Sequence, residues 1–182
     1  MTPDDFDPGP LADVECHQAD GQWTLVFTKQ FRHAPEKVWA ALTDPDQLGR
    51  WAPYTADRDL GSTGDVTLTM IDSESPTDLS CEVTRSEPVT LLEHSWGEAT
   101  LRWELTPTAS GTRLALHQTT PDKGAIPRSA AGWHLCLRVA EHLLDGDPID
   151  PIRGDDAMNY GWEELNKAYA DKLGISEDDA RR

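Results

Sequence analysis

The sequence is poor in cysteine and contains no disulfide pattern. Its 182 residues include only Cys16, Cys81 and Cys136, which are widely separated and form no C-x-x-C pair. An odd number of isolated cysteines argues against a disulfide framework and favours reduced thiols that act as small apolar side chains. We therefore predict a cytoplasmic protein.

Basic side chains are also scarce. The chain has 16 Lys and Arg against 33 Asp and Glu, a formal net charge of -17. Such an excess of negative charge repels nucleic acids and anionic lipid surfaces, so we expect neither as a partner. No run of about 18 apolar residues is present, which excludes a transmembrane helix. Residues 1–10 are rich in Asp, Pro and Gly, so we predict a flexible acidic tail. They also lack the apolar core of a signal peptide.

The common catalytic and metal-binding signatures are missing. The sequence has no Gly-rich phosphate loop, no H-E-x-x-H and no G-x-S-x-G. His134 and His142 lie more than two helical turns apart, a poor spacing for metal ligands. The Asp-rich stretch 145–156 lacks the glycine that a calcium loop needs at its sixth position. We expect no metal and no cofactor, and the evidence for an enzyme is thin.

The sequence does contain a series of alternating apolar and polar segments, which is typical of strands with one buried face. Short turn sequences separate them, so successive strands should pair in an antiparallel sheet of about six or seven strands. Lys29 interrupts the apolar face of the first long strand, which suggests an edge or a bulge there. The predicted strands are 14–18, 22–31, 66–70, 79–84, 92–96, 101–105 and 113–117.

Helical patterns flank the strands. Pro35 and Pro45 begin two short helices after the first long strand. The stretch 128–146 predicts a long helix whose apolar arc covers roughly 200°, wide enough to be contacted from more than one side. A final helix is predicted at about 157–173. We expect one α+β domain over residues 11–146, followed by residues 147–182, a linker and a final helix docked on the same domain.

Three strings in this order resemble a known family: PEKVWAALTDPDQLGRW (35–51), LRWELTPTASGTRLALHQTT (101–120) and AGWHLCLRVAEHLLDG (131–146). They resemble the SRPBCC, or START-related, superfamily, and within it the group of the activator of the ninety-kilodalton heat-shock protein ATPase. The stretch NYGWEELNKAYADKLG (159–174) is similar to the tail of a bacterial subset of this group.

The resemblance implies a helix-grip fold, a curved antiparallel sheet wrapped around the long C-terminal helix with a hydrophobic cavity between them. Members of the superfamily include lipid and hormone carriers, polyketide cyclases and chaperone activators. They share no catalytic signature that can be carried over to residues of this chain. The resemblance therefore implies a fold and a cavity, and no particular reaction.

The aromatic residues are the main candidates for a binding site. Seven Trp dominate a set of 13 aromatic residues. These rings either fill the core or form the walls of an apolar pocket. Trp51 and Tyr54 are expected in a loop at the open end of the fold. The full set of candidate ligand-binding residues is Trp51, Tyr54, Met70, His94, Trp96, Trp103, Trp133, Cys136, Leu137 and Ala140.

His94 is the one candidate for catalysis. Strand alternation places it on the apolar face together with Leu92 and Trp96. It is either a core histidine hydrogen-bonded to a neighbour, or a polar group inside a cavity that orients a ligand or transfers protons.

Three functions follow from these observations. The first is binding of a small apolar or aromatic molecule in the cavity between sheet and helix. The second is an interaction module for a chaperone or another protein, using the polar side of the long helix at Arg138 and Glu141. The third is an enzyme resembling polyketide cyclases and dehydratases. A homodimer is one of the oligomeric states left open.

Overall fold

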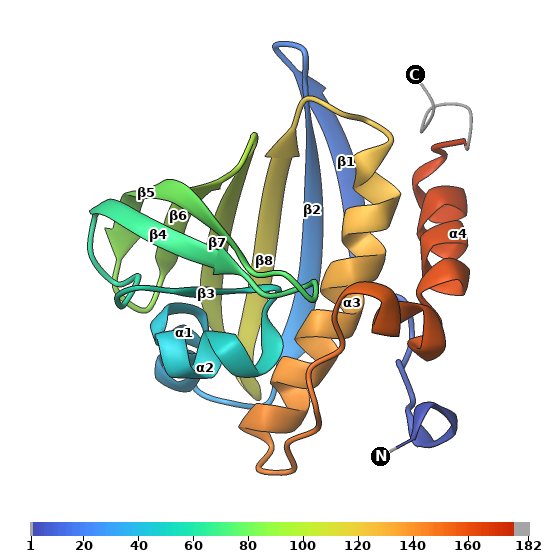
Figure 1. The fold of residues 1–182 in the computed structure, drawn as a ribbon, viewed down its shortest axis with the longest axis horizontal. Coiled ribbons are helices and arrows are strands. Elements are labelled where there is room, and N and C mark those ends of the chain that lie inside the picture. The colour runs from blue at the N-terminus through green and yellow to red at the C-terminus, as the bar shows by residue number, and fades with distance from the viewer. Residues whose placement is uncertain (1, 177–182) are drawn as a thin grey trace.

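In the computed structural model, which describes residues 2–176, eight antiparallel strands form one curved sheet (Figure 1). The order across the sheet is β1-β2-β8-β7-β6-β5-β4-β3. The strands are β1 (Asp13–Ala19), β2 (Gln22–Phe31), β3 (Tyr54–Ala56), β4 (Gly64–Met70), β5 (Thr77–Glu87), β6 (Leu91–Trp96), β7 (Ala99–Thr108) and β8 (Gly111–Thr120).

The α+β helix-grip prediction is confirmed, with one strand more than expected. The additional strand is β3, which lies where a loop was predicted. It has only three residues and pairs with the end of β4, Tyr54 opposite Met70. Three residues are too few for an alternation pattern to be recognised in a sequence.

The turn between β1 and β2 sets the register in which these two strands pair. Asp20 and Gly21 have φ of 54° and 75°, so both central positions of the turn are left-handed. This geometry matches the right-handed twist of the flanking strands. Beyond the turn, Leu25, Phe27 and Phe31 are buried on one face of β2.

Two short helices close one end of the sheet, α1 (Pro35–Thr43) and α2 (Pro45–Trp51). Each begins with proline, as predicted. The side chain of Asp44 accepts a hydrogen bond from the backbone N–H of Asp46 at 3.0 Å, which caps α2. The helices place Leu48 and Trp51 in the core.

The long helix α3 (Ala125–Leu144) crosses the concave face of the sheet (Figure 1). It begins three residues before the predicted start. Pro127 can lie in its first turn, because the backbone N–H groups of the first turn have no hydrogen-bond partner within the helix and proline lacks that N–H. Twelve of its residues are buried. The sheet covers one side of α3, and a final helix α4 (Trp162–Leu173) runs along the other (Figure 1).

The N-terminal segment packs against the segment that follows α3. After Gly146, the linker leads to a short 3-10 helix, η2 (Gly154–Tyr160), and then to α4. A 3-10 turn, η1 (Pro3–Asp5), precedes Phe6, whose ring meets Tyr160 edge-on at 5.3 Å between centroids. Phe6 is buried, so the segment predicted as a flexible tail makes specific contacts within the described residues. The predicted final segment 147–182 continues past the described part of the chain.

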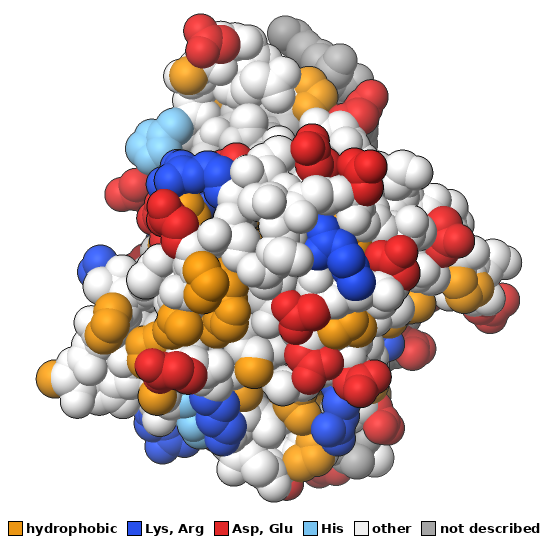
Figure 2. All heavy atoms as spheres, turned by 90° about the vertical axis from the view of Figure 1, so that its left-hand side faces the viewer, with side chains coloured by type: hydrophobic (Ala, Val, Ile, Leu, Met, Phe, Trp, Pro, Cys, Tyr) orange, Lys and Arg blue, Asp and Glu red, His pale blue; other side chains and the backbone are white. Residues whose placement is uncertain are grey.

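Among the described residues, no helix is both long and apolar enough to cross a membrane. Figure 2 shows one face of the molecule, on which acidic side chains are spread between smaller basic groups. This distribution agrees with the net charge of -17.

Candidate functional site

A continuous group of rings fills the space between the sheet and α3. Trp103 meets Trp51 edge-on at 6.1 Å and Trp133 edge-on at 5.3 Å between centroids. Trp133 in turn lies 5.6 Å from Trp96, and Trp96 lies 5.9 Å from Tyr54. Offset and edge-on contacts of this kind stabilise a core beyond simple burial. The deep part of the predicted cavity is therefore occupied by the protein's own side chains.

Trp51 and Tyr54 belong to this core. The prediction that they sit in an open loop is wrong, because Trp51 is the last residue of α2 and Tyr54 is the first of β3. Trp51 is fully buried, and its indole N–H donates to the carbonyl of Ala41 at 2.9 Å. Tyr54 is buried beside the ring of His94.

His94 lies on the apolar face as predicted and is fully buried. Its Nδ1 is 3.1 Å from the carbonyl oxygen of Ser95, so this nitrogen carries the hydrogen and donates it. Its Nε2 accepts a hydrogen bond from the indole N–H of Trp103 at 3.3 Å. Burial lowers the pKa of His94 from 6.5 to about 4. Both ring nitrogens are thus engaged, which favours the core histidine; a catalytic role for His94 stays a prediction.

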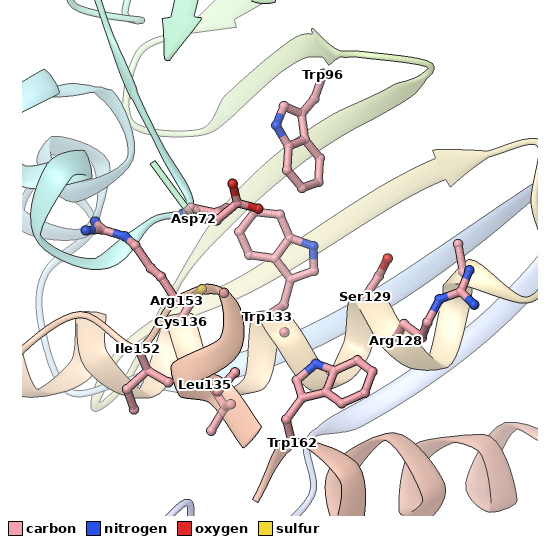
Figure 3. A pocket seen from close by; sticks show the side chains of 15 residues that line it. Asp72, Trp96, Arg128, Ser129, Trp133, Leu135, Cys136, Ile152, Arg153 and Trp162 are labelled. Carbon is pink, nitrogen blue, oxygen red and sulfur yellow. The ribbon is translucent and has the colours of Figure 1, made fainter. Parts of the chain in front are cut away.

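A pocket of about 380 Å³ opens beside the ring group, between the first half of α3 and the segment 152–162 (Figure 3). Three indole rings line it, those of Trp96 on β6, Trp133 on α3 and Trp162 on α4. Its other lining residues are Pro53, Asp72, Ala125, Arg128, Ser129, Gly132, Leu135, Cys136, Ile152, Arg153, Gly154 and Ala157.

The pocket includes only part of the predicted site. Trp96, Trp133 and Cys136 line it. The other seven candidates do not: Met70 accepts a hydrogen bond from Trp96 on its sulfur at 3.1 Å, and the remaining six are buried in the core. These six are Trp51, Tyr54, His94, Trp103, Leu137 and Ala140.

The segment 152–154 forms the outer wall of the pocket. The guanidinium of Arg153 donates to the carbonyls of Ala52 at 2.9 Å and Gly49 at 2.6 Å, which ties the segment to α2. Gly154 has φ of 54°, and a Cβ there would overlap the carbonyl oxygen of Asp72. Only glycine permits this close approach. Sequence reasoning missed this wall, because no periodicity links an irregular segment to a helix.

Gly132 is a further part of the pocket that sequence reasoning missed. It lies on α3, lines the pocket, and a Cβ built there would meet nothing within 4 Å. Glycine in a helix interior costs about 1 kcal/mol relative to alanine. The unfilled space above Gly132 is therefore part of the pocket, kept open at some cost to the helix.

The polar side of α3 is used inside the molecule. His134 donates from Nε2 to the carbonyl of Pro8 at 2.7 Å, and its Nδ1 accepts from the hydroxyl of Tyr169 on α4 at 2.6 Å. Glu141 forms ion pairs with Lys29 at 3.0 Å and Arg138 at 2.8 Å. Lys29 thus interrupts the apolar face of β2 in order to meet Glu141.

These contacts bear on the hypothesis of a protein partner at Arg138 and Glu141. Arg138 also donates to the carbonyl of Asp7 at 3.0 Å, so both side chains hold the N-terminal segment and β2 against α3. Replacing them would alter packing as well as any docking surface. A chaperone or other protein partner, and a homodimer, stay predictions.

The chain is similar to known proteins over most of its length. The model of the family described as Activator of Hsp90 ATPase homolog 1-like protein matches residues 32–145. No curated protein matches the chain.

Several solved structures share the fold. A conserved protein of unknown function from Enterococcus faecalis, EF2215, superimposes with a TM-score of 0.68 at 16% identity, covering 90% of this chain and 92% of that one. CalU16 from Micromonospora echinospora gives 0.66 at 20% identity, with 88% and 95% covered. Protein MLL2253 from Mesorhizobium loti gives 0.59 at 27% identity, with 69% and 99% covered.

Proposed function

The chain belongs to the family of Activator of Hsp90 ATPase homolog 1-like proteins, and within that family we propose that it binds a small apolar or aromatic molecule. The binding site is the pocket between α3 and the segment 152–162. The observation that carries this proposal is the arrangement of three indole rings around an open space of about 380 Å³. This volume lies in the usual range for small-molecule sites, which are concave and mostly apolar.

The site differs from the deep cavity expected from the sequence. The interior rings already fill the space beneath α3, so a ligand packs against the outer surfaces of Trp96 and Trp133. Five of the lining residues, at positions 152, 153, 154, 157 and 162, follow the end of the family match at residue 145. The fold of the family therefore supplies one wall, and the C-terminal segment of this chain supplies the other.

Gly132 offers a direct test of the pocket. In Gly132→Phe, the new ring should enter the empty space and displace a ligand without a clash at Cβ. The neutral fluorescent probe N-phenyl-1-naphthylamine should bind the unmodified protein and bind Gly132→Phe at least about tenfold more weakly, a loss of about 1.4 kcal/mol. A fluorescence titration measures both affinities.

Gly132→Ala is the matched control. It should keep the pocket open, bind the probe as the unmodified protein does, and raise the free energy of unfolding by about 1 kcal/mol. Equal probe affinities in Gly132→Phe and Gly132→Ala would show that the ligand binds elsewhere. Ala140→Trp would instead overpack the core, since Ala140, a candidate from the sequence, is buried and does not line the pocket.

A further inference from the structure

Asp72 stands out among the residues of the pocket. It follows β4 in the turn toward β5 and is half-buried. Asp72 lines the pocket together with Trp96 and Trp133, and Figure 3 shows its carboxylate on the side of the pocket where these two rings lie. Within residues 2–176, its side chain forms no hydrogen bond and no ion pair. A half-buried carboxylate that has no hydrogen-bond partner in the protein can pair with a charged group of a ligand.

The two arginines of the pocket form their hydrogen bonds with other groups, although the charge of Asp72 opposes the lowering of the Arg153 pKa by burial. Arg153 directs its guanidinium away from Trp133, toward the carbonyls of Ala52 and Gly49 (Figure 3). Arg128 donates to the carboxylate of Asp122 at 3.2 Å. The negative charge of Asp72 also acts on a neighbouring buried thiol. Burial raises the pKa of Cys136 to about 12; the charge of Arg153 opposes this rise, and the charge of Asp72 adds to it.

The rings around Asp72 also favour a positive charge. The face of an indole carries negative electrostatic potential, and Trp binds cations better than the other aromatic residues. Trp96 and Trp133 lie with their centroids 5.6 Å apart, and Trp162 lines the pocket from α4. A carboxylate among indole rings provides charge neutralisation and cation–π contact at one place.

A hollow next to the pocket is acidic. An adjoining hollow of about 580 Å³ shares Asp72, Arg153 and Gly154 with the pocket. Its lining contains four carboxylates against the single guanidinium of Arg153; they belong to Asp72, Glu74, Asp155 and Asp156. A cleft lined by one sign of charge raises the local concentration of the opposite ion, and the net charge of -17 acts in the same direction.

We propose that the ligand is an organic cation, an apolar or aromatic body that carries an ammonium group. Its ammonium pairs with Asp72 and its body packs between Trp96, Trp133 and Trp162. This inference rests on the proposed function, because it names the chemical class of molecule that the same pocket takes.

Three probes of one shape test the charge preference by isothermal titration calorimetry at pH 7. They are 2-naphthylmethylamine, which is a cation, 2-naphthalenemethanol, which is neutral, and 2-naphthoate, which is an anion. The amine should bind at least about tenfold more tightly than the alcohol, and the anion more weakly than both. In Asp72→Asn, the advantage of the amine over the alcohol should disappear, while the affinity for the alcohol stays within about twofold.

Asp78→Asn is the matched control, since Asp78 lies on β5 outside the pocket and accepts a hydrogen bond from Thr69 at 2.7 Å that asparagine can also accept. It removes one negative charge and should leave the preference for the amine in place. Retention of that preference in Asp72→Asn would overturn the role of Asp72.

The outcomes separate this inference from the proposed function. Equal affinities for amine and alcohol in the unmodified protein, with both lost in Gly132→Phe, would overturn the charge preference and leave the pocket as the binding site. Binding of amine and alcohol that persists in Gly132→Phe would overturn the proposed site itself, and with it the inference.

Discussion

At the scale of single residues, His94 makes the stability of the core depend on pH. Its Nε2 accepts the indole hydrogen of Trp103, so a second proton on the ring would face a donor. Burial lowers the pKa of His94 from 6.5 to about 4. Between these values the unfolded chain binds the proton and the folded protein does not. The free energy of unfolding should therefore fall as pH decreases from about 6.5 to about 4, by about 3 kcal/mol in total.

Urea unfolding at a series of pH values measures this decline. In His94→Gln the amide can replace both hydrogen bonds but does not titrate, so the decline should be shallower. His17→Gln is the control, because His17 is exposed on β1, and it should follow the unmodified protein. An unchanged pH dependence in His94→Gln would mean that other groups cause the decline.

Single residues also mark the limit of the sequence analysis. Alternation along 92–96 placed His94 and Trp96 on the inner face, because a strand exposes successive side chains on opposite sides. The same pattern does not reveal how deep a ring lies, so it cannot separate the core residue Trp103 from the pocket residue Trp96. No sequence pattern singles out Asp72, since Trp133 and Gly154, which line the same pocket, are distant in sequence.

At the scale of elements, the helices α3 and α4 and the N-terminal segment are joined by one hydrogen-bond chain. The N–H of Ala12 donates to the hydroxyl of Tyr169 at 2.9 Å, which donates to His134, which donates to the carbonyl of Pro8. Helical spacing predicted α4 and its apolar side. It could not predict this chain, because the polar stripe of α3 has the same pattern whether it faces water or another segment.

Tyr169→Phe tests the strength of this connection. The ring of Tyr169 is fully buried, so the substitution keeps the packing but leaves Nδ1 of His134 and the N–H of Ala12 without partners. The free energy of unfolding, from urea titration, should fall by about 1–3 kcal/mol.

Tyr160→Phe is the matched control for that experiment. Tyr160 packs edge-on against Phe6, and its hydroxyl makes no hydrogen bond to the described residues. Its loss should change the free energy of unfolding by less than about 0.5 kcal/mol. Similar small effects of both substitutions would show that the chain through Tyr169 contributes little to docking of α4.

At the scale of the whole molecule, the fold was predictable and the position of the pocket was not. Burial requires that a sheet with one apolar face be covered, and the only long apolar helix in the sequence had to cover it. The pocket instead depends on where the segment 152–162 lies, and that position follows from contacts such as Arg153 with Gly49 and Ala52. Those contacts join an irregular segment to α2 across about 100 residues of chain.

Net charge acts on the stability of the whole molecule. The formal net charge is -17, and the excess carboxylates repel one another more strongly in the compact state than in the unfolded chain. Raising NaCl from about 10 mM to about 100 mM shortens the screening length from about 30 Å to about 10 Å. At pH 7 the free energy of unfolding should therefore rise with salt, on the order of 1 kcal/mol, seen as a higher urea midpoint.

The same salt series at pH 4.5, the isoelectric point of the sequence, is the control. The net charge is then close to zero, so salt has little repulsion to screen and the urea midpoint should stay nearly constant. The half-buried pair of Lys29 and Glu141 is screened less than exposed pairs are, so weakening of ion pairs should not outweigh the gain at pH 7. A midpoint that falls with salt at pH 7 would mean that attractive pairs, and not the excess of carboxylates, dominate the electrostatics of this fold.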